Sequence, residues 1–151
     1  MPELSSLVME MAIAVDANDF RRASGWLERA CLERGVPVNE IGRLDICVNE
    51  ILANILAHGG ERARSTPILL RFVTQEDFPA QEALVTIVDA GKPFNPLDAL
   101  VAVRPQTLAE AEPGGLGLSM IRGSADSLSY RYLDDRNHLS VGVRWSEVGN
   151  G

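Results

Sequence analysis

The hydrophobic and polar positions at the start of the chain predict a strand followed by a helix. Residues 7–15 alternate loosely and are rich in Met, Val and Ile, which favours a strand. A helix is expected to follow and to run to about Arg34, with Asn18 or Asp19 as its N-cap residue. The sequence Gly35-Val36-Pro37 then ends this helix, because glycine and proline interrupt helical structure.

The clearest predicted element is a second helix over residues 40–58. Asn39 can cap its first turn, and the Gly59-Gly60 pair ends it. At about 100° per residue, its apolar side chains fall within roughly a quarter turn. These side chains are Ile41, Leu44, Val48, Ile51, Leu52 and Ile55. Glu50 and Asn54 line up along the edge of this apolar face, so a polar stripe should border the core.

The middle of the chain predicts a pair of strands and then an irregular segment. Residues 67–75 and 83–89 are apolar and β-branched, and the polar residues 76–82 between them read as their connection. Residues 92–113 contain four prolines and little periodicity. Long irregular segments are uncommon in compact domains and are usually functional, so this segment is expected to be a lid.

The last part of the chain predicts a helix and a terminal hairpin. Residues 116–125 return to helical spacing. Residues 127–133 and 138–145 have the composition of strands, and Asp134-Asp135-Arg136-Asn137 between them reads as the connecting turn. The complete pattern of helices and strands indicates a chain of mixed α and β structure.

Length and composition indicate a single domain over residues 1–151. A chain of 151 residues with 46% hydrophobic and 23% charged residues can bury one substantial core. The formal net charge is −7 and no lysine or arginine run is present, so nucleic acid and membranes are not expected partners. The sequence shows neither a secretory leader nor the roughly 18 consecutive apolar residues of a membrane span, and we expect a cytoplasmic protein.

Two short motifs carry groups that suit a nucleotide. Glu50 and Asn54 lie one helical turn apart, and a carboxylate and an amide at this spacing can hold a water molecule, a hydroxyl group or a metal ion. The same pair also occurs at ordinary boundaries between core and solvent. Asp89 follows a predicted strand and can accept a hydrogen bond from the amine of adenine, while Gly91 lets the ring approach the backbone. An ordinary turn has the same composition.

A third motif, Gly114-Gly115-Leu116-Gly117-Leu118, leads into the last predicted helix. Glycines before a helix expose backbone N–H groups, and the helix dipole favours a phosphate there. A dinucleotide-binding fold would use Asp134 or Asp135 for the ribose, but a proline-bearing loop stands where that fold has a strand, and the last glycine of its fingerprint is missing. A glycine-rich helix start without a ligand is the remaining alternative.

The order of the three motifs resembles the N, G1 and G2 boxes of the Bergerat-fold ATPases, the superfamily that includes gyrase B, histidine kinases and MutL. More closely, residues 48–58, 88–96 and 114–126 resemble the small serine-protein kinase and anti-sigma factor branch. The resemblance extends over about residues 18–145. It implies an α+β fold, a two-layer α/β sandwich in which helices pack on one face of a mixed, mostly antiparallel sheet and ATP binds on the helix side.

The resemblance also implies roles for individual residues. Asn54 matches the asparagine that coordinates Mg²⁺, and Glu50 matches the glutamate that acts as general base. Asp89 matches the aspartate that reads adenine. The base pocket and the phosphate loop are matched by Gly91 and by Gly114-Gly115-Leu116-Gly117-Leu118. The chain departs from the family at Asn95, where aspartate is common, and residues 97–113 have no recognisable match.

A function follows from the resemblance as an expectation. It implies an ATP-dependent serine/threonine-protein kinase and anti-sigma-type regulator of a bacterial partner-switching system, with ATP and Mg²⁺ as cofactors. The expected partners are a small antagonist protein, phosphorylated on serine or threonine, and a sigma factor or equivalent target. Some members of the branch also form homodimers through the sheet.

Two alternatives stay open at the level of the sequence. One is a binding module that holds ATP without transferring phosphate and acts as an anti-sigma factor or adaptor by sequestration alone. The other is a phosphotransfer domain detached from a histidine kinase, but the chain lacks a dimerisation helix pair with a phosphorylatable histidine. The presence of both Glu50 and Asn54 favours the kinase over the silent binding module.

Overall fold

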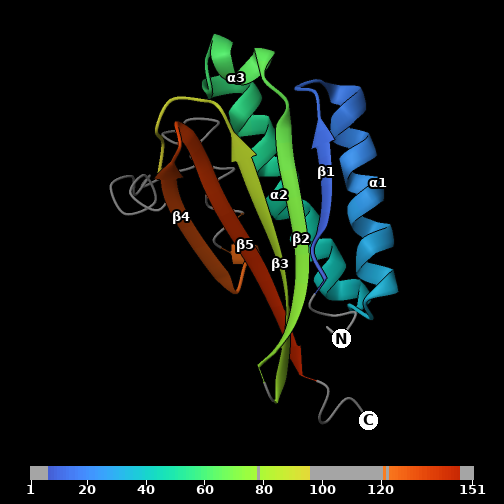
Figure 1. The fold of residues 1–151 in the computed structure, drawn as a ribbon. Helices are drawn as coiled ribbons and strands as arrows, with labels where there is room; N and C mark the ends of the chain where they lie inside the picture. Colours follow the sequence, from blue (N-terminus) through green and yellow to red (C-terminus); the bar gives the residue numbers. More distant parts are fainter. Residues whose placement is uncertain (1–6, 78, 96–120, 122, 147–151) are drawn as a thin grey trace, which may run out of the picture.

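The computed structural model describes residues 7–77, 79–95, 121 and 123–146, which form three helices and a five-stranded sheet (Figure 1). The helices are α1 (Ala17–Glu33), α2 (Val38–His58) and α3 (Glu61–Ser65). The strands are β1 (Met9–Ile13), β2 (Ile68–Asp77), β3 (Ala80–Asp89), β4 (Ser127–Leu133) and β5 (Arg136–Ser146). In Figure 1, α2 lies behind the sheet, α1 lies beside β1 at the right, and α3 lies near one end of α2.

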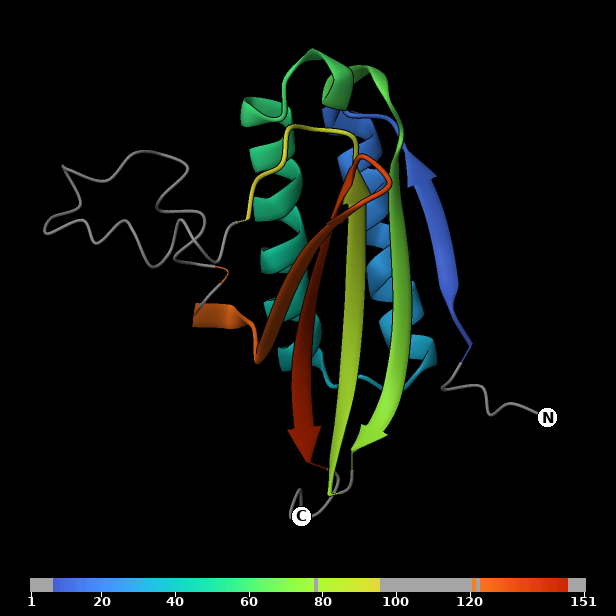
Figure 2. The same ribbon diagram turned by 60° about the vertical axis from the view of Figure 1, so that its left-hand side comes forward.

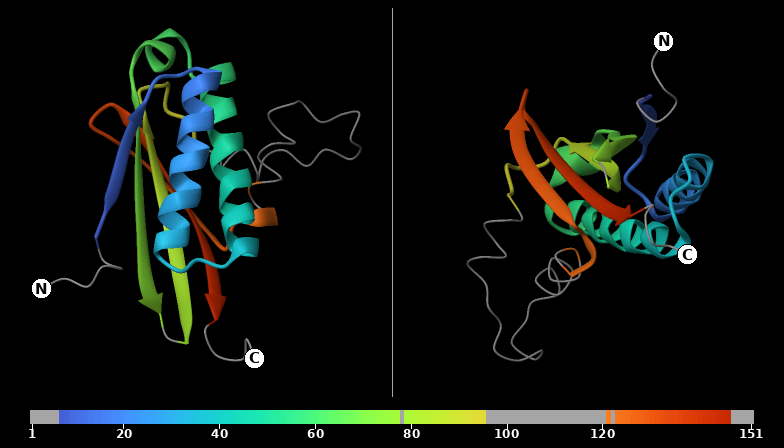
Figure 3. Two further views of the ribbon diagram at one scale, coloured as in Figure 1. Left: turned by 90° about the vertical axis from the view of Figure 1, so that its right-hand side faces the viewer. Right: turned by 90° about the horizontal axis from the view of Figure 1, so that it is seen from below.

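The strands follow the order β1-β2-β3-β5-β4, and every described pair of neighbouring strands is antiparallel. Both α1 and α2 pack on one face of this sheet, and no described helix covers the other face (Figure 3). The predicted two-layer α+β sandwich is therefore confirmed. Within the described residues the sheet is antiparallel throughout, without the parallel pairs that a mixed sheet would contain.

The core lies between the helix layer and the sheet. Along β3 and β5, alternate side chains face this layer, because successive residues of a strand point to opposite faces. The buried side chains of these strands include Ala83, Val85, Ile87, Val141 and Val143. All the apolar side chains predicted to form the inner face of the second helix are buried as well, so that prediction is confirmed. No described helix is long and apolar enough to cross a membrane.

The start of α1 is fixed by two carboxylates. Asp16 is the N-cap residue, and its Oδ1 accepts a hydrogen bond from the N–H of Asp19 at 2.8 Å. The Asp19 carboxylate reaches back and accepts from the N–H of Ala14 at 2.7 Å. This reciprocal arrangement satisfies backbone groups on both sides of the helix start. The prediction of Asn18 or Asp19 as the cap is wrong, because the first strand ends earlier and the helix begins earlier than expected.

The turn between α1 and α2 is closed by a glycine. Gly35 has a φ of 76°, and the N–H of Val36 donates to the carbonyl of Cys31 at 3.0 Å, as in a Schellman motif. Helix α2 begins directly after Pro37 without a side-chain cap, so the prediction of Asn39 as its cap is wrong. The predicted break between the two helices is confirmed.

The end of α2 at His58 agrees with the prediction. A Cβ on Gly59 would lie 2.6 Å from the carbonyl oxygen of Ile55 and 2.7 Å from the Cβ of Ala63, so this position has no room for a side chain. Gly60 has a φ of 89°, a conformation that other residues rarely adopt. The chain then forms the short helix α3, which the sequence pattern does not predict because five residues are too few to show a helical period.

The β2–β3 hairpin is longer than predicted. The polar residues 76–82, expected to form a connection, mostly belong to the two strands. Glu82 is only 5% exposed and is satisfied within the sheet. Its Oε2 accepts from Nε of Arg144 at 3.0 Å and from the hydroxyl of Ser127 at 3.1 Å. Its Oε1 accepts from the side-chain amide of Gln75, its partner across the hairpin, at 2.8 Å. Polar composition does not mark a loop here, because both oxygens of Glu82 have partners within the sheet.

The β4–β5 hairpin is tighter than predicted. Its loop consists of Asp134 and Asp135, with φ angles of 53° and 59°, which fits a two-residue type I′ turn. Arg136 and Asn137, predicted to lie in the turn, are instead the first residues of β5. Asn137 therefore pairs with Asp89 across the sheet.

The predicted helix over residues 116–125 is described only at its end. Ile121, Gly123 and Ser124 are helical, and the N–H of Ala125 donates to the carbonyl of Ile121 at 2.9 Å. Residues 96–120 and 122 lie outside the described residues. Most of the predicted lid and the whole motif Gly114-Gly115-Leu116-Gly117-Leu118 therefore remain predictions.

Helix α2 provides a test of the core. Leu52 is completely buried, whereas Leu56, one turn later, is 39% exposed. Leu52→Ala leaves a cavity between the layers, so we expect it to lower the free energy of unfolding by about 2–5 kcal/mol. Leu56→Ala, the matched control, should lower it by about 1 kcal/mol or less. Urea denaturation followed by circular dichroism measures both, and equal losses would contradict the assignment of this face to the core.

Candidate nucleotide site

Asp89, the last residue of β3, is held in place through one of its two carboxylate oxygens. The residue is only 7% exposed. Its Oδ1 accepts from the N–H of Gly91 at 2.8 Å and from the side-chain amide of Asn137 at 3.1 Å. Its Oδ2 makes no hydrogen bond within the described residues. The protein thus orients the carboxylate and leaves one oxygen for another donor.

Burial raises the pKa of the Asp89 carboxyl group above its ordinary value. The N–H of Gly91 and the amide of Asn137 lower this pKa, as do the neighbouring Arg136 and His138, but they do not cancel the effect of burial. A buried carboxylate with incomplete compensation gains from each additional hydrogen-bond donor. Carboxyl groups with raised pKa values cluster at binding and catalytic sites, which makes Asp89 a candidate ligand-binding residue.

Gly91 brings the loop after β3 directly against the end of α2. A Cβ on Gly91 would lie 2.8 Å from Oδ1 of Asp89 and 3.1 Å from the carbonyl oxygen of Gly59. The next residue, Lys92, donates its N–H to the same Gly59 carbonyl at 3.4 Å. Lack of space therefore requires glycine at position 91. Two elements far apart in the sequence meet here, backbone to backbone.

Asn137 holds the segment that follows Asp89, in addition to its bond with that carboxylate. The residue is 5% exposed. Its amide nitrogen donates to the carbonyl of Gly91 at 3.2 Å and to that of Lys92 at 2.9 Å. Its Oδ1 accepts from the N–H of Phe94 at 3.1 Å and from the hydroxyl of Tyr130 at 2.5 Å. One amide thus connects β5, β4 and the loop after β3.

The sequence does not single out Asn137, because its place beside Asp134-Asp135 suggests a turn. One signal could have found it. Alternate residues of the last strand, among them Leu139 and Val141, are apolar and face the core, and Asn137 continues this series. A polar side chain on the core face of a strand requires partners, and the loop after β3 supplies them.

Glu50 and Asn54 are half-buried on α2, and the side chain of neither makes a hydrogen bond within the described residues. At about 100° per residue, these two side chains share an arc of roughly 60° with Arg43 and Cys47. They also lie between those residues and Gly59 along the helix. The predicted polar stripe at the border of the core is therefore confirmed, and it runs toward the Asp89 loop.

Arg43 and Cys47 hold Ile121 and residues 124–126 against α2. The guanidinium group of Arg43 donates to the carbonyl of Ser124 at 3.0 Å and to the carboxylate of Asp126 at 2.9 Å. The thiol of Cys47 donates to the carbonyl of Ile121 at 3.7 Å. Figure 2 shows the loop after β3 (yellow) and the short turn near residue 121 (orange) on the same side of α2. The face of α2 that carries Glu50 and Asn54 thus extends from the contacts of Arg43 and Cys47 to the contact between Gly59 and the loop after β3.

The side chains on this face suit a magnesium nucleotide. The amide oxygen of Asn54 and the carboxylate of Glu50 are oxygen donors, which Mg²⁺ prefers. No group of three or more His, Cys, Asp or Glu side chains that could hold a metal ion occurs in the part of the chain that the structure describes. An Mg²⁺ ion at Asn54 would take most of its ligands from water and phosphate, as is usual for nucleotide sites. Gly91 keeps backbone, rather than a side chain, beside the Asp89 carboxylate.

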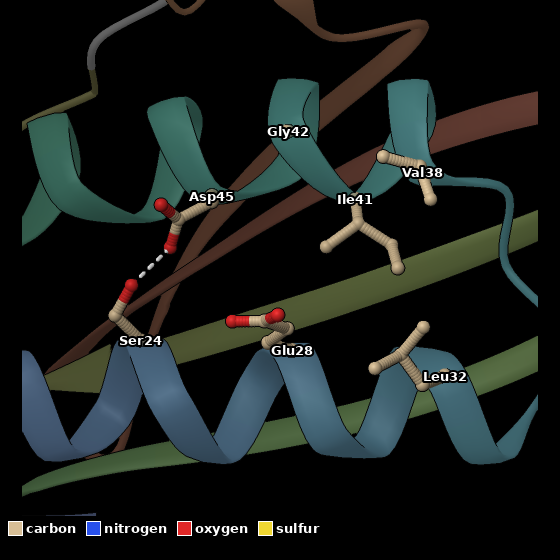
Figure 4. Close-up of a pocket in the computed structure, with 7 residues that line it drawn as sticks. All are labelled: Ser24, Glu28, Leu32, Val38, Ile41, Gly42 and Asp45. Carbon is tan, nitrogen blue, oxygen red and sulfur yellow. Dashed lines mark hydrogen bonds between the residues drawn. The ribbon is translucent and has the colours of Figure 1, made fainter.

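A pocket of about 260 Å³ lies elsewhere, between α1 and α2 (Figure 4). Its lining includes Glu28 and Asp45, and the hydroxyl of Ser24 donates to Asp45 at 2.5 Å. Leu32 and Val38 line its other end. Two carboxylates oppose the binding of a triphosphate, because like charges repel. This pocket is therefore not a candidate ATP site.

The raised pKa of Asp89 predicts a conflict between binding and stability. Above the folded-state pKa the carboxylate is charged in both states, and burial destabilises the folded one. Asp89→Asn should therefore raise the free energy of unfolding near pH 7. The gain should shrink as the pH falls through the folded-state pKa and vanish below the unfolded value of about 3.9, where the parent side chain is neutral in both states. Urea denaturation at a series of pH values measures this; a loss of stability at neutral pH would contradict it.

Comparison with known proteins places the chain in a family. Residues 13–143 match the family described as the histidine kinase-like ATPase domain. The serine/threonine-protein kinase BtrW of Bordetella bronchiseptica is 29% identical over 138 residues, a match that covers 91% of this chain and 94% of BtrW.

Two solved structures share the fold. The structure of the RsbU and RsbW domains of Rv1364c from Mycobacterium tuberculosis matches with a TM-score of 0.63 and 13% identity, over 91% of this chain but only 32% of that one. The SiaB-SiaC complex from Pseudomonas aeruginosa matches with a TM-score of 0.57 and 16% identity, over 91% of this chain and 89% of the other. Because the family match spans most of the sequence, the chain belongs to the histidine kinase-like ATPase domain family.

Proposed function

We propose that this chain is an ATP-dependent serine/threonine-protein kinase and anti-sigma-type regulator of a bacterial partner-switching system, acting as a single domain. It transfers the γ-phosphoryl group of ATP to a small antagonist protein and binds a sigma factor or an equivalent target. The observation that carries the proposal is the pairing of two features: a buried Asp89 with one uncommitted oxygen, and Glu50 with Asn54 on the helix face that leads to it.

The similarity to BtrW supports the catalytic part of the proposal. That protein is a serine/threonine-protein kinase, and the match extends over nearly the full length of both chains. The likeness to the SiaB-SiaC complex supports a protein partner, since that structure contains two proteins. These relatives favour a kinase that acts on another protein over a detached histidine-kinase domain.

The base and the phosphates of ATP would be held at opposite ends of the proposed site. Oδ2 of Asp89 accepts a hydrogen bond from the exocyclic amine of adenine, while the N–H of Gly91 holds Oδ1 of the same carboxylate. Asn54 holds Mg²⁺ through its amide oxygen. The backbone of Gly114-Gly115-Leu116-Gly117-Leu118, which lies outside the described residues, donates to the phosphates.

Glu50 is the proposed general base. Its carboxylate accepts the proton of the serine or threonine hydroxyl as the hydroxyl oxygen bonds to the γ-phosphorus, and the bond to the β-phosphate oxygen breaks to release ADP. Mg²⁺, when bound, supplies charge neutralisation for the phosphates. Since Glu50 has no hydrogen-bond partner within the described residues, its carboxylate is not committed to a structural role there.

The proposal includes the cellular setting. ATP and regulatory proteins of this kind occur in the cytoplasm, so we place the chain there. The face of the sheet that no described helix covers is the proposed surface for a homodimer, while the helix side holds the nucleotide.

Nucleotide binding gives the first test of this proposal. Isothermal titration calorimetry should detect ATP and ADP with Mg²⁺ present. Asp89→Ala should lose the preference for adenine over guanine nucleotides, because guanine presents an acceptor where adenine presents its amine. Asn54→Ala should mainly lose the dependence on Mg²⁺, while Asn49→Ala on the same helix, the matched control, should bind like the parent. A parent protein that binds neither nucleotide would contradict the proposal.

Glu50→Ala separates the kinase from a silent binding module. A general base stabilises the transition state more than bound substrate, so this variant should bind Mg-ATP nearly as well as the parent yet transfer phosphate at least about 100-fold more slowly. The assay follows labelled phosphate from ATP to the small antagonist protein encoded near this chain. Glu33→Ala, at the exposed end of α1, is the matched control.

The outcomes of this assay lead to different conclusions. If the parent binds ATP and the antagonist protein but transfers no phosphate, the chain is a binding module that acts by sequestration. If Glu50→Ala transfers phosphate normally, another group is the base and the ATP site itself is unaffected.

A further inference from the structure

We propose that Asn137 is the positioning residue that sets the adenine specificity of the site, through its control of Asp89 and the loop that follows it. This inference rests on the proposed ATP site at Asp89. It assigns a role to a residue on β5 that no motif identifies, and that role can fail while ATP binding itself is upheld.

The nitrogen of the Asn137 amide donates hydrogen bonds and its oxygen accepts them. Its two N–H groups are shared among three oxygens, on the Asp89 carboxylate and on the carbonyls of Gly91 and Lys92. Its oxygen lies between two donors, the N–H of Phe94 and the hydroxyl of Tyr130. Only a side chain with a donor on one side and an acceptor on the other satisfies all five contacts. The orientation of the amide is therefore fixed.

This arrangement decides which oxygen the base can reach. Oδ1 of Asp89 is engaged by Asn137 at 3.1 Å and by the N–H of Gly91 at 2.8 Å. The carbonyls of Gly91 and Lys92, which could also accept from an amine, are engaged by the same amide. Oδ2 of Asp89 has no hydrogen-bond donor within the described residues, and it is a carboxylate oxygen. Such an oxygen attracts the amine of adenine and repels the carbonyl of guanine, so the arrangement favours ATP over GTP.

A purely structural role for Asn137 would have a different signature. Loss of a structural contact would weaken nucleotide binding by the same factor at every pH. Asn137 also donates directly to the Asp89 carboxylate and lowers its pKa, so its loss should raise the pH below which adenine binding fades. Arg136 and His138 lower the same pKa, and Lys92 lies in the adjoining loop. These three residues are unchanged in the variants, so their own effects cancel when variant and parent are compared.

The variant Asn137→Leu removes all five hydrogen bonds without adding a titratable group. We expect its affinity for Mg-ATP to fall about 10- to 100-fold near pH 8, with a smaller ratio between ATP and GTP affinities. When ATP affinity is plotted against pH, affinity falls at acidic pH; we expect the midpoint of this fall, the acidic midpoint, to move to higher pH in the variant. Calorimetry with ATP and GTP between about pH 4 and about pH 8 measures these quantities.

A second variant tests the inference in case Asn137→Leu fails to fold. Asn137→Asp keeps the acceptor for Phe94 and Tyr130 but places an oxygen against Oδ1 of Asp89. The paired carboxylates should move the acidic midpoint in the same direction as Asn137→Leu does. A matched control accompanies it. Asn49→Asp makes the same chemical change on α2 and should leave binding unaltered.

Each result has a definite meaning. Weaker ATP binding together with a shifted midpoint in either Asn137 variant supports the inference. Parental affinity and midpoint in both variants would overturn it while leaving the ATP site intact. Weaker binding with an unchanged midpoint would also overturn it, because Asn137 would then act only as a structural contact. A parent protein that binds no ATP would overturn the proposed function and this inference together.

Discussion

The packing of one face of α2 against the sheet is the interaction on which the rest of the structure depends. It buries a stripe of aliphatic side chains between the layers, including Leu44, Val48 and Leu52. Because a helix turns about 100° per residue, burial of this stripe fixes the direction of every other residue on α2. Glu50 and Asn54 are thereby held at the border of the core, where water is partly excluded. Polar contacts made there are stronger than in open solvent.

The same packing brings the end of α2 to the loop after β3, where two glycines allow the backbones to meet. Gly59 and Gly91 each lack room for a Cβ, so neither can be replaced without moving a neighbour. Burial of the Asp89 carboxylate beside them costs free energy, and the hydrogen bond from Asn137 offsets part of that cost. A site that binds a ligand through a buried charge therefore lowers the stability of the fold that carries it.

The fold itself tolerates nearly complete replacement of its sequence. It is shared at 13% and 16% identity with the two solved structures, which means that its layers require patterns of apolar residues more than particular side chains. Fold alone does not define an activity, so the chemistry has to be argued from the site. In this chain the candidate groups lie on the face of α2 between Arg43, which binds residues 124 and 126, and Gly59, which meets the loop after β3.

The sequence by itself determined the features that depend on near neighbours. The apolar face of α2, its end before Gly59-Gly60 and the strands of both hairpins follow from local periodicity, and the motif order indicated the family. Only the tertiary structure decided where polar residues go when their partners are distant. Glu82 lies in a strand because Arg144 and Ser127 satisfy it, and Asn137 leaves the predicted turn because the Asp89 loop binds it. These partners are 45–62 residues away, beyond the reach of any local pattern.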